Sequence, residues 1–335
     1  MSFTEDFRGK LRCTLCPHGC ILDDGKTGVC RVRRNEGGEL SLPYYGVLSA
    51  VSTDPIEKKP LYHFYPGSSI FSIGFYGCSF NCPFCQNYSI AHFTPAEGTG
   101  SVKSRRVRPE EIVKSARSEG ATGIAYTYSE PLVHFEWLLE TAQIAAKTGL
   151  RNVLVTNGYI NEEPARQLLP YIHAANVDLK SFNPDYYTRV IGGRLEPVLN
   201  FIKTAAEYIH IEVTTLVIPG ETDSEEEIES IAGFLSDINP DIPYHLSCYY
   251  PTYKYTIPPT NPKTVFKLME TAKKKLNYVY PGNVGLSEVE SECPKCGNTL
   301  VRRTGYKTTV TGIKKGSDNS TQCGSCGAPV PFLIE

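Results

Sequence analysis

Twelve cysteines are the feature that most constrains this chain, because eleven of them fall into three groups. The groups are Cys13, Cys16, Cys20 and Cys30 near the N-terminus, Cys78, Cys82 and Cys85 in the middle, and Cys293, Cys296, Cys323 and Cys326 near the C-terminus. Cys248 stands alone. The first twelve residues are polar and lack the apolar core of a signal peptide, so we expect a cytoplasmic chain. Grouped thiols in a reducing compartment indicate metal binding rather than disulfides.

The overall composition excludes several other classes of protein. Hydrophobic residues make up 41% and charged residues 21% of the chain, which is ordinary for a globular protein and argues against disorder. The formal net charge of −2 gives no support to nucleic-acid or membrane binding by the whole protein. No run of about 18 apolar residues occurs, so we expect no membrane span.

Short β-rich runs alternate with helical stretches through the middle of the chain. The runs cover residues 70–75, 123–128, 152–157, 176–181, 211–218 and 242–248, with a short seventh at 278–281. One helix is expected from Pro131 to near Gly149, and another after Ser224. This alternation predicts an α/β fold with parallel βαβ units. Six or seven units are too few for a closed eight-fold barrel, so a partial (β/α)6-type barrel is expected, with an open doubly wound sheet as the alternative.

The segments outside this barrel are expected to be small modules. We predict an N-terminal cysteine-rich metal-binding module at residues 1–66, the barrel at 67–288, and a C-terminal module at 289–335. In the last module, two CxxC knuckles 26 residues apart are typical of a zinc ribbon or a rubredoxin-like unit. Zinc is favoured there, with iron or an iron–sulfur cluster as alternatives. The less regular N-terminal set leaves zinc and a second iron–sulfur cluster equally open.

Several of the predicted strands end in polar residues that could face a site. These residues are Glu130, Asn157, Asp178 with Lys180, and His245. Any one of them would be explained by helix capping or by exposure to water. Because the carboxyl ends of parallel strands share one edge, four such positions in succession indicate a site at that edge.

The three central cysteines lie directly after the predicted strand at 70–75, in the sequence GFYGCSFNCPFCQN. A [4Fe–4S] cluster has four irons, and this short spacing supplies three thiolates, which leaves one iron open. A zinc site would instead be closed by a fourth ligand, for which Cys248 or His92 is available. A redox disulfide loop is the remaining alternative.

At this loop the sequence resembles the radical S-adenosylmethionine (SAM) superfamily, whose signature is CxxxCxφC with an aromatic residue, here Phe84, at φ. Within it, the chain resembles the pyruvate formate-lyase-activating-enzyme group, and more closely the radical SAM enzyme of the AmmeMemoRadiSam system. The matching segments are residues 13–33, 126–131, 153–159 and 177–182 and the final CxxC pairs. The resemblance implies that the open iron binds SAM and that reductive cleavage gives a 5′-deoxyadenosyl radical, which abstracts hydrogen from a substrate.

The resemblance also implies which residues contact SAM. They are Phe84, Gln86, Ser129, Glu130, Thr156, Asn157, Asp178, Lys180 and His245. Glu130 would accept from the methionine ammonium, although this chain has YSEP where the family has two glycines. Asp178 and Lys180 would contact the ribose or the carboxylate. A core histidine is the alternative for His245.

The sequence therefore leaves two classes of function open for this chain. It is either a radical SAM enzyme or a non-catalytic metal-rich binding protein. The resemblance points to a protein substrate, to AMMECR1-like and Memo-like companion proteins, and to an electron donor. An RNA substrate is the alternative, supported by basic residues in the C-terminal module. Cys248 is either a buried inert thiol or a hydrogen-atom donor.

Overall fold

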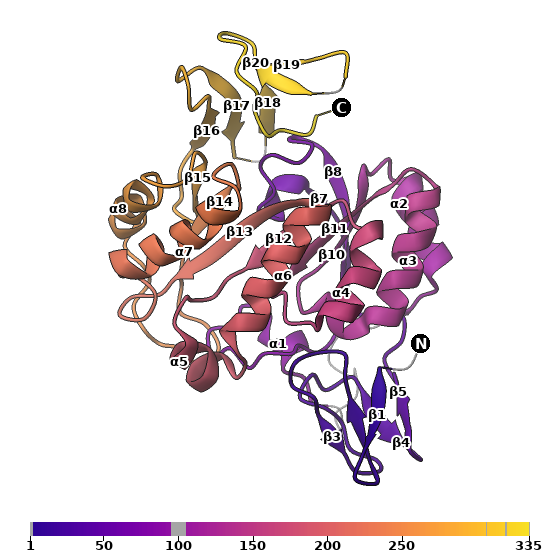
Figure 1. The fold of residues 1–335 in the computed structure, drawn as a ribbon. Coiled ribbons are helices and arrows are strands. Elements are labelled where there is room, and N and C mark those ends of the chain that lie inside the picture. Colours follow the sequence, from indigo (N-terminus) through magenta and orange to yellow (C-terminus); the bar gives the residue numbers. More distant parts are fainter. Residues whose placement is uncertain (1–2, 95–104, 306, 319, 335) are drawn as a thin grey trace.

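The computed structural model describes residues 3–94, 105–305, 307–318 and 320–334, and its centre is an eight-stranded sheet (Figure 1). The strand order is β15-β14-β13-β12-β11-β10-β8-β7. Strands β8 to β15 pair in parallel, and their bounds are β8 (Ser69–Gly74), β10 (Gly123–Thr127), β11 (Arg151–Thr156), β12 (Ala174–Asp178), β13 (His210–Val217), β14 (Tyr244–Cys248) and β15 (Val279–Gly282). These strands confirm the seven β-rich runs expected from the sequence.

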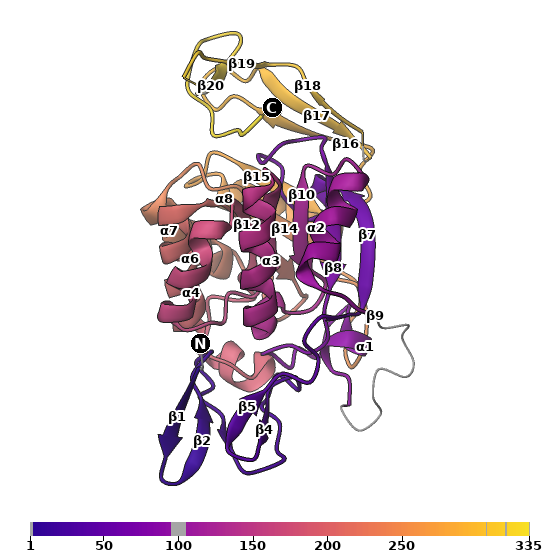
Figure 2. The same cartoon turned by 90° about the vertical axis from the view of Figure 1, so that its right-hand side faces the viewer.

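Helices connect the parallel strands and lie along one face of the sheet (Figure 2). They are α2 (Pro109–Ser118), α3 (Phe135–Lys147), α4 (Glu162–Leu168), α6 (Leu195–Tyr208), α7 (Glu225–Ile238) and α8 (Pro262–Ala272). Because β7 and β15 stand at opposite ends of the strand order, the sheet stays open. The fold is therefore the partial (β/α)6-type barrel that the alternating pattern predicted.

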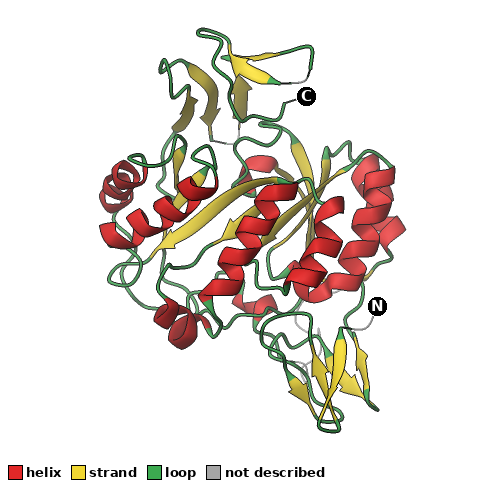
Figure 3. Cartoon of the chain, viewed as in Figure 1, coloured by secondary structure: helices red, strands yellow, loops and turns green. Residues whose placement is uncertain are grey.

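Helix ends follow the local chemistry of the sequence. The helix expected at Pro131 begins with a 3-10 turn, η3 (Pro131–His134), and continues as α3 to Lys147. Gly149 then takes a positive φ of 82°, which suits the end of a helix. Helix α7 begins after Ser224, whose hydroxyl accepts from the Glu227 backbone N–H. Both predicted helices are confirmed, and the secondary structure is coloured in Figure 3.

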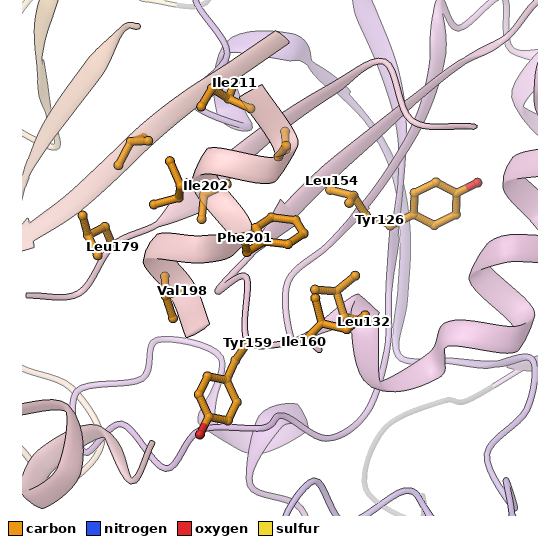
Figure 4. Close-up of a cluster of buried hydrophobic side chains, with 14 of the residues drawn as sticks. Tyr126, Leu132, Leu154, Tyr159, Ile160, Leu179, Val198, Phe201, Ile202 and Ile211 are labelled. Atoms are coloured by element: carbon orange, nitrogen blue, oxygen red, sulfur yellow. The ribbon is translucent and has the colours of Figure 1, made fainter. Parts of the chain in front are cut away.

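The main core lies between the helices and the sheet (Figure 4). Val198, Phe201 and Ile202 of α6 pack with the fully buried Leu154 of β11 and with Ile211 of β13. Burying these apolar side chains on both elements is the main source of stability for such a layered fold.

The barrel sheet begins earlier than the boundary expected at residue 66. Strand β7 (Ala50–Pro55) pairs antiparallel with β8, so residues 50–55 belong to the central sheet. Pairing β7 there covers the backbone groups along the β8 edge. Residues 56–68 then connect the end of β7 to the start of β8, at the amino edge of the parallel strands.

The C-terminal module sits on this amino edge (Figure 1). It contains a sheet of β16 (Glu288–Glu292), β17 (Thr299–Thr304) and β18 (Lys307–Val310) and a hairpin of β19 (Ile313–Lys315) and β20 (Thr321–Cys323). The backbone of Leu333 donates to His63 O at 2.8 Å and accepts from Tyr65 N at 2.7 Å. The module is therefore joined to the connection between β7 and β8.

A buried carboxylate anchors that same connection to the barrel. Glu212 of β13 is fully buried and accepts from the backbone N–H groups of Tyr62 and His63 at 2.9 and 2.7 Å. Its two oxygens also bond Nε2 of His210 and His245 at 3.0 and 2.7 Å. The charge is thus surrounded by donors, as a buried carboxylate requires.

The N-terminal module lies at the opposite, carboxyl edge (Figure 2). It contains a sheet of β1 (Thr4–Phe7), β2 (Lys10–Cys13) and β3 (Ile21–Leu22) and a hairpin of β4 (Arg34–Glu36) and β5 (Glu39–Ser41). The His18 ring bonds the Ser79 carbonyl at 2.7 Å, and Arg33 Nε donates to Val133 O at 3.1 Å. Among the described helices, none is long and apolar enough to cross a membrane.

We expect the free energy of unfolding to fall as the pH drops from about 6.5 to about 4. Burial lowers the pKa of His134 from 6.5 to about 4, so the folded protein leaves this ring neutral while the unfolded chain binds a proton. The contribution of neutral His134 to the free energy of unfolding is fully present above pH 6.5. About 3 kcal/mol of this contribution is lost by pH 4.

His134→Gln should flatten this pH dependence, because an amide N–H replaces the ring as donor to Tyr76 O and does not titrate. Urea unfolding at several pH values measures the change. An equally steep dependence in the variant would contradict it.

Candidate functional site

The three-cysteine loop, residues 76–87, leaves the carboxyl end of β8 beneath the N-terminal module. Gly77, its second residue, has a φ of +81°, and a Cβ there would lie 2.3 Å from the Cys30 carbonyl oxygen. Only glycine therefore allows this close passage. Cys78, Cys82 and Cys85 follow as free thiols.

Backbone hydrogen bonds hold the loop at three positions. Asn81 N donates to Ile191 O at 2.9 Å, Lys254 N donates to Pro83 O at 2.9 Å, and Gly77 N donates to Ile90 O at 2.9 Å. Phe84 is buried, with its ring 5.7 Å from that of Tyr255, whereas Gln86 is exposed. Protein contacts alone thus hold the loop in place.

Burial gives the three thiols unusual acid–base properties. It raises the pKa of Cys78 well above its usual value and the pKa of Cys82 to about 12, and it raises the pKa of Cys85. A thiolate is costly in such surroundings unless a cation lies against it. Metal ions supply that cation, so the donor set fits a metal cluster.

A second set of side chains gathers around Glu130, at the start of η3. Its Oε1 accepts from Leu132 N at 3.0 Å and from the Thr156 hydroxyl at 2.6 Å, and its Oε2 accepts from Asn157 N at 2.8 Å. Burial raises the pKa of Glu130 to about 7, although these three donors oppose the shift. The carboxylate therefore joins the ends of β10 and β11.

Asn157 links this network to the cysteine loop. Its Nδ2 lies 3.0 Å from the Ser79 hydroxyl and 3.6 Å from Cys78 Sγ, while its Oδ1 accepts from Tyr159 N at 2.9 Å. Ser129 contacts the same region by donating its hydroxyl to Phe75 O at 2.9 Å. The structure thus brings Ser129, Glu130, Thr156 and Asn157 together beside Cys78.

Asp178 and Lys180 reach the loop from the end of β12. Lys180 Nζ lies 2.8 Å from Asp178 Oδ2. Burial acts to lower the pKa of Lys180, but Asp178 and the Cys82 and Cys85 thiols outweigh it and raise that pKa above its usual value. Lys180 is therefore a cation close to two of the three thiols.

His245 is placed apart from this group. It is the second residue of β14, lies 3% exposed, and bonds Glu212 beneath the C-terminal module. Its ring also packs edge-on against Tyr62, with centroids 4.8 Å apart. This environment is that of a core histidine, the alternative to the SAM contact that the resemblance implied.

The two side chains considered as a fourth ligand differ in position. Cys248 ends β14 and is fully buried in the apolar cluster of Leu246 and Val217, as an inert thiol would be. His92 lies beside the Cys82 backbone, and burial lowers its pKa to about 4. Its Nε2 is buried and has no hydrogen-bond partner among the described residues.

The C-terminal cysteines form a compact group of a different kind. Cys293 Sγ and Cys326 Sγ are 3.7 Å apart, as are Cys296 Sγ and Cys323 Sγ. Tetrahedral coordination with metal–sulfur bonds of about 2.3 Å requires sulfurs about 3.8 Å apart. These four thiols can therefore hold one metal ion.

Several residues that support the site were not singled out in the sequence. The Tyr187 hydroxyl accepts from Lys180 N at 3.0 Å, and Glu227 Oε1 accepts from the Ser181 hydroxyl and from Phe182 N, each at 2.5 Å. Glu227 belongs to the acidic first turn of α7, which the sequence showed as a helix start only. Nothing in the sequence indicated that it would reach the β12 loop.

Comparison with known proteins places this geometry in context. A family profile described as the Radical SAM superfamily matches residues 72–234. An uncharacterized protein of Methanocaldococcus jannaschii is 38% identical over 330 residues, which cover 97% of this chain and 96% of that protein. The pyruvate formate-lyase-activating enzyme of Clostridium pasteurianum is 24% identical over 186 residues, 51% of this chain and 73% of that enzyme.

A similar fold is found among solved structures. The structure of a radical SAM methyltransferase from Sphaerobacter thermophilus aligns with a TM-score of 0.50 at 18% identity, covering 70% of this chain and 71% of that one. At this identity the likeness shows the shared fold.

Glu130→Gln should destabilise the fold by about 1–3 kcal/mol, because an amide N–H would replace one acceptor that now faces backbone or hydroxyl donors. Chemical unfolding measures the loss. Glu163→Gln, an exposed change on α4, is the matched control and should leave stability unchanged. Equal stability of the two variants would contradict the role given to Glu130.

Proposed function

The chain belongs to the radical SAM superfamily, and we propose that it holds a [4Fe–4S] cluster on Cys78, Cys82 and Cys85 and uses it to cleave SAM reductively. When bound, these cofactors supply a 5′-deoxyadenosyl radical that abstracts hydrogen from a substrate. The observation that carries the proposal is the loop of three free thiols, Cys82 buried and Cys78 and Cys85 partly buried, at the carboxyl edge of the parallel sheet.

The chemistry of the donors supports this cluster. Three thiolates on one loop leave one iron of a cubane open, which is where the amino and carboxylate groups of SAM would bind. Lys180 lies close enough to Cys82 and Cys85 for its charge to oppose the rise in the pKa of both thiols that burial causes, so it would offset part of the negative charge of a thiolate-bound cluster.

The residues around the loop are suited to hold SAM. Glu130 uses three of its roughly four acceptor positions within the protein, which leaves one for the methionine ammonium. Asn157, Asp178 and Lys180 present polar groups from the next two strand ends. Phe84 and Gln86 on the loop itself would contact the adenine.

Ser129 and Thr156 are assigned a positioning role. The Ser129 hydroxyl donates to Phe75 O, and the Thr156 hydroxyl donates to Glu130, so both hydroxyls are already hydrogen-bonded to groups at this edge. His245 is left out of the SAM site, since both its position and its bond to Glu212 belong to the amino edge.

We propose a protein as the substrate, in keeping with the activating-enzyme relative. The subtype is then a glycyl-radical-activase-like oxidoreductase of the AmmeMemoRadiSam kind, with AMMECR1-like and Memo-like proteins as companions and a separate electron donor. The basic residues of the C-terminal module give little support to an RNA substrate. The module lies at the amino edge, across the sheet from the cysteine loop.

We also propose zinc for the C-terminal cysteines. Their sulfur spacing matches a tetrahedral zinc–thiolate site. The module is small, with a core of few buried residues, so the ion would act as a structural element.

Cys82→Ala should abolish formation of 5′-deoxyadenosine, because a cluster cannot be held by the two remaining thiolates. The assay is anaerobic incubation of iron- and sulfide-reconstituted protein with SAM and dithionite, followed by chromatography of the nucleoside. Ser118→Ala, an exposed change on α2, is the control and should retain product. Undiminished product in Cys82→Ala would overturn the proposal.

The substrate can be traced by the same chemistry. Companion proteins labelled with deuterium should transfer the label into 5′-deoxyadenosine if one of them is the hydrogen donor. Label transfer from deuterated RNA, with none from protein, would contradict the substrate class.

A further inference from the structure

The four N-terminal cysteines surround one small enclosed cavity at the carboxyl edge of the barrel. Its lining consists of Cys13, Leu15, Cys16, His18, Cys20, Gly28, Cys30, Arg33 and Val133. Three of the four thiols come from the β2–β3 region, and Cys30 comes from the following loop. The chain therefore folds back so that all four sulfurs share one space.

The spacing of these sulfurs differs from that of the C-terminal site. Among the described residues, Cys293, Cys296, Cys323 and Cys326 are the one group in which three or more ligand atoms lie within 4.8 Å of one another. The N-terminal thiols line a common cavity, but no three of their sulfurs all lie within that distance of one another. One tetrahedral ion needs sulfurs about 3.8 Å apart, whereas a cubane binds each thiolate at a different corner.

The surroundings of the cavity are suited to a negatively charged cluster. Backbone N–H groups of Leu15, His18 and Val32 hydrogen-bond the thiol sulfurs of Cys13, Cys16 and Cys30. Hydrogen bonds to sulfur and a nearby cation are the usual means by which a protein stabilises an iron–sulfur cluster.

Arg33 supplies the cation. It is 3% exposed, lines the cavity, donates Nε to Val133 O at 3.1 Å and pairs with Glu136. Leu15 and Val133 make the rest of the lining apolar, which limits the access of water.

We propose that Cys13, Cys16, Cys20 and Cys30 hold a second [4Fe–4S] cluster, closed by four thiolates. With every iron ligated by the protein, this cluster has no position for SAM. The assignment does not depend on the chemistry proposed for the three-cysteine loop.

The cavity lies directly against that loop. A Cβ on Gly77, the residue before Cys78, would contact the Cys30 carbonyl, and the His18 ring bonds the carbonyl of Ser79, the residue after Cys78. Arg31 Nη2 also donates to Asn81 Oδ1 at 2.7 Å. The second cluster would therefore be a close neighbour of the first.

Metal analysis of two proteins tests the proposal. The full chain and a Cys78→Ala/Cys82→Ala/Cys85→Ala variant are purified anaerobically, reconstituted with iron and sulfide, and analysed for iron, sulfide and zinc. We expect about eight iron ions per full chain and about four in the variant. About one zinc ion should remain in both, at the C-terminal site.

A second variant identifies the ligands. Adding Cys16→Ala and Cys20→Ala to the triple variant should remove the remaining iron and leave zinc unchanged. If the full chain instead carries about four iron ions and about two zinc ions, the N-terminal site is a zinc site and the proposal is overturned. The full-chain count decides this even if the cysteine variants fail to fold.

Discussion

The parallel pairing of the strands is the constraint on which the rest of this structure depends. Because β8, β10, β11 and β12 run in one direction, the cysteine loop, Glu130, Asn157 and Asp178 all emerge at one edge. The buried carboxylate of Glu130 then ties two of these strand ends together and orients Asn157 toward Cys78. The parallel pairing of these strands thus brings together side chains that lie far apart in the sequence.

The same constraint separates the two small modules. The N-terminal module packs at the carboxyl edge through His18 and Arg33, so it covers the three-cysteine loop. The C-terminal module is held at the amino edge through Leu333 and Arg303, the latter donating to Tyr62 O at 2.5 Å. The N-terminal module therefore lies beside the three-cysteine loop, whereas the C-terminal module lies at the opposite edge of the sheet.

Much of this could be predicted from the sequence. The β-rich runs and the start signals at Pro131 and Ser224 identified the elements, because periodicity and capping are local properties. The edge shared by Glu130, Asn157 and Asp178 followed from the parallel topology. His245 was expected at the end of a strand, but it is the second residue of β14, because the sequence does not show how far a strand continues beyond a polar residue.

Other features depend on contacts that no local pattern reveals. The sequence of residues 50–55 did not show whether this segment belongs to the barrel or to the N-terminal module. It belongs to the barrel because it pairs with the otherwise free edge of β8. Likewise, the cysteine spacing alone left zinc and iron–sulfur equally open for the N-terminal group. The separation of the sulfurs, which only the fold sets, distinguishes it from the C-terminal group.

The proposed three-cysteine loop cluster has one iron open to SAM, and this open iron is the feature to test. The most direct measurement is the electron paramagnetic resonance spectrum of the reduced, reconstituted protein with and without SAM. SAM should change the spectrum of the full chain and leave that of the Cys78→Ala/Cys82→Ala/Cys85→Ala variant unchanged. A full-chain spectrum that SAM does not alter would contradict the binding of SAM to a cluster on this loop.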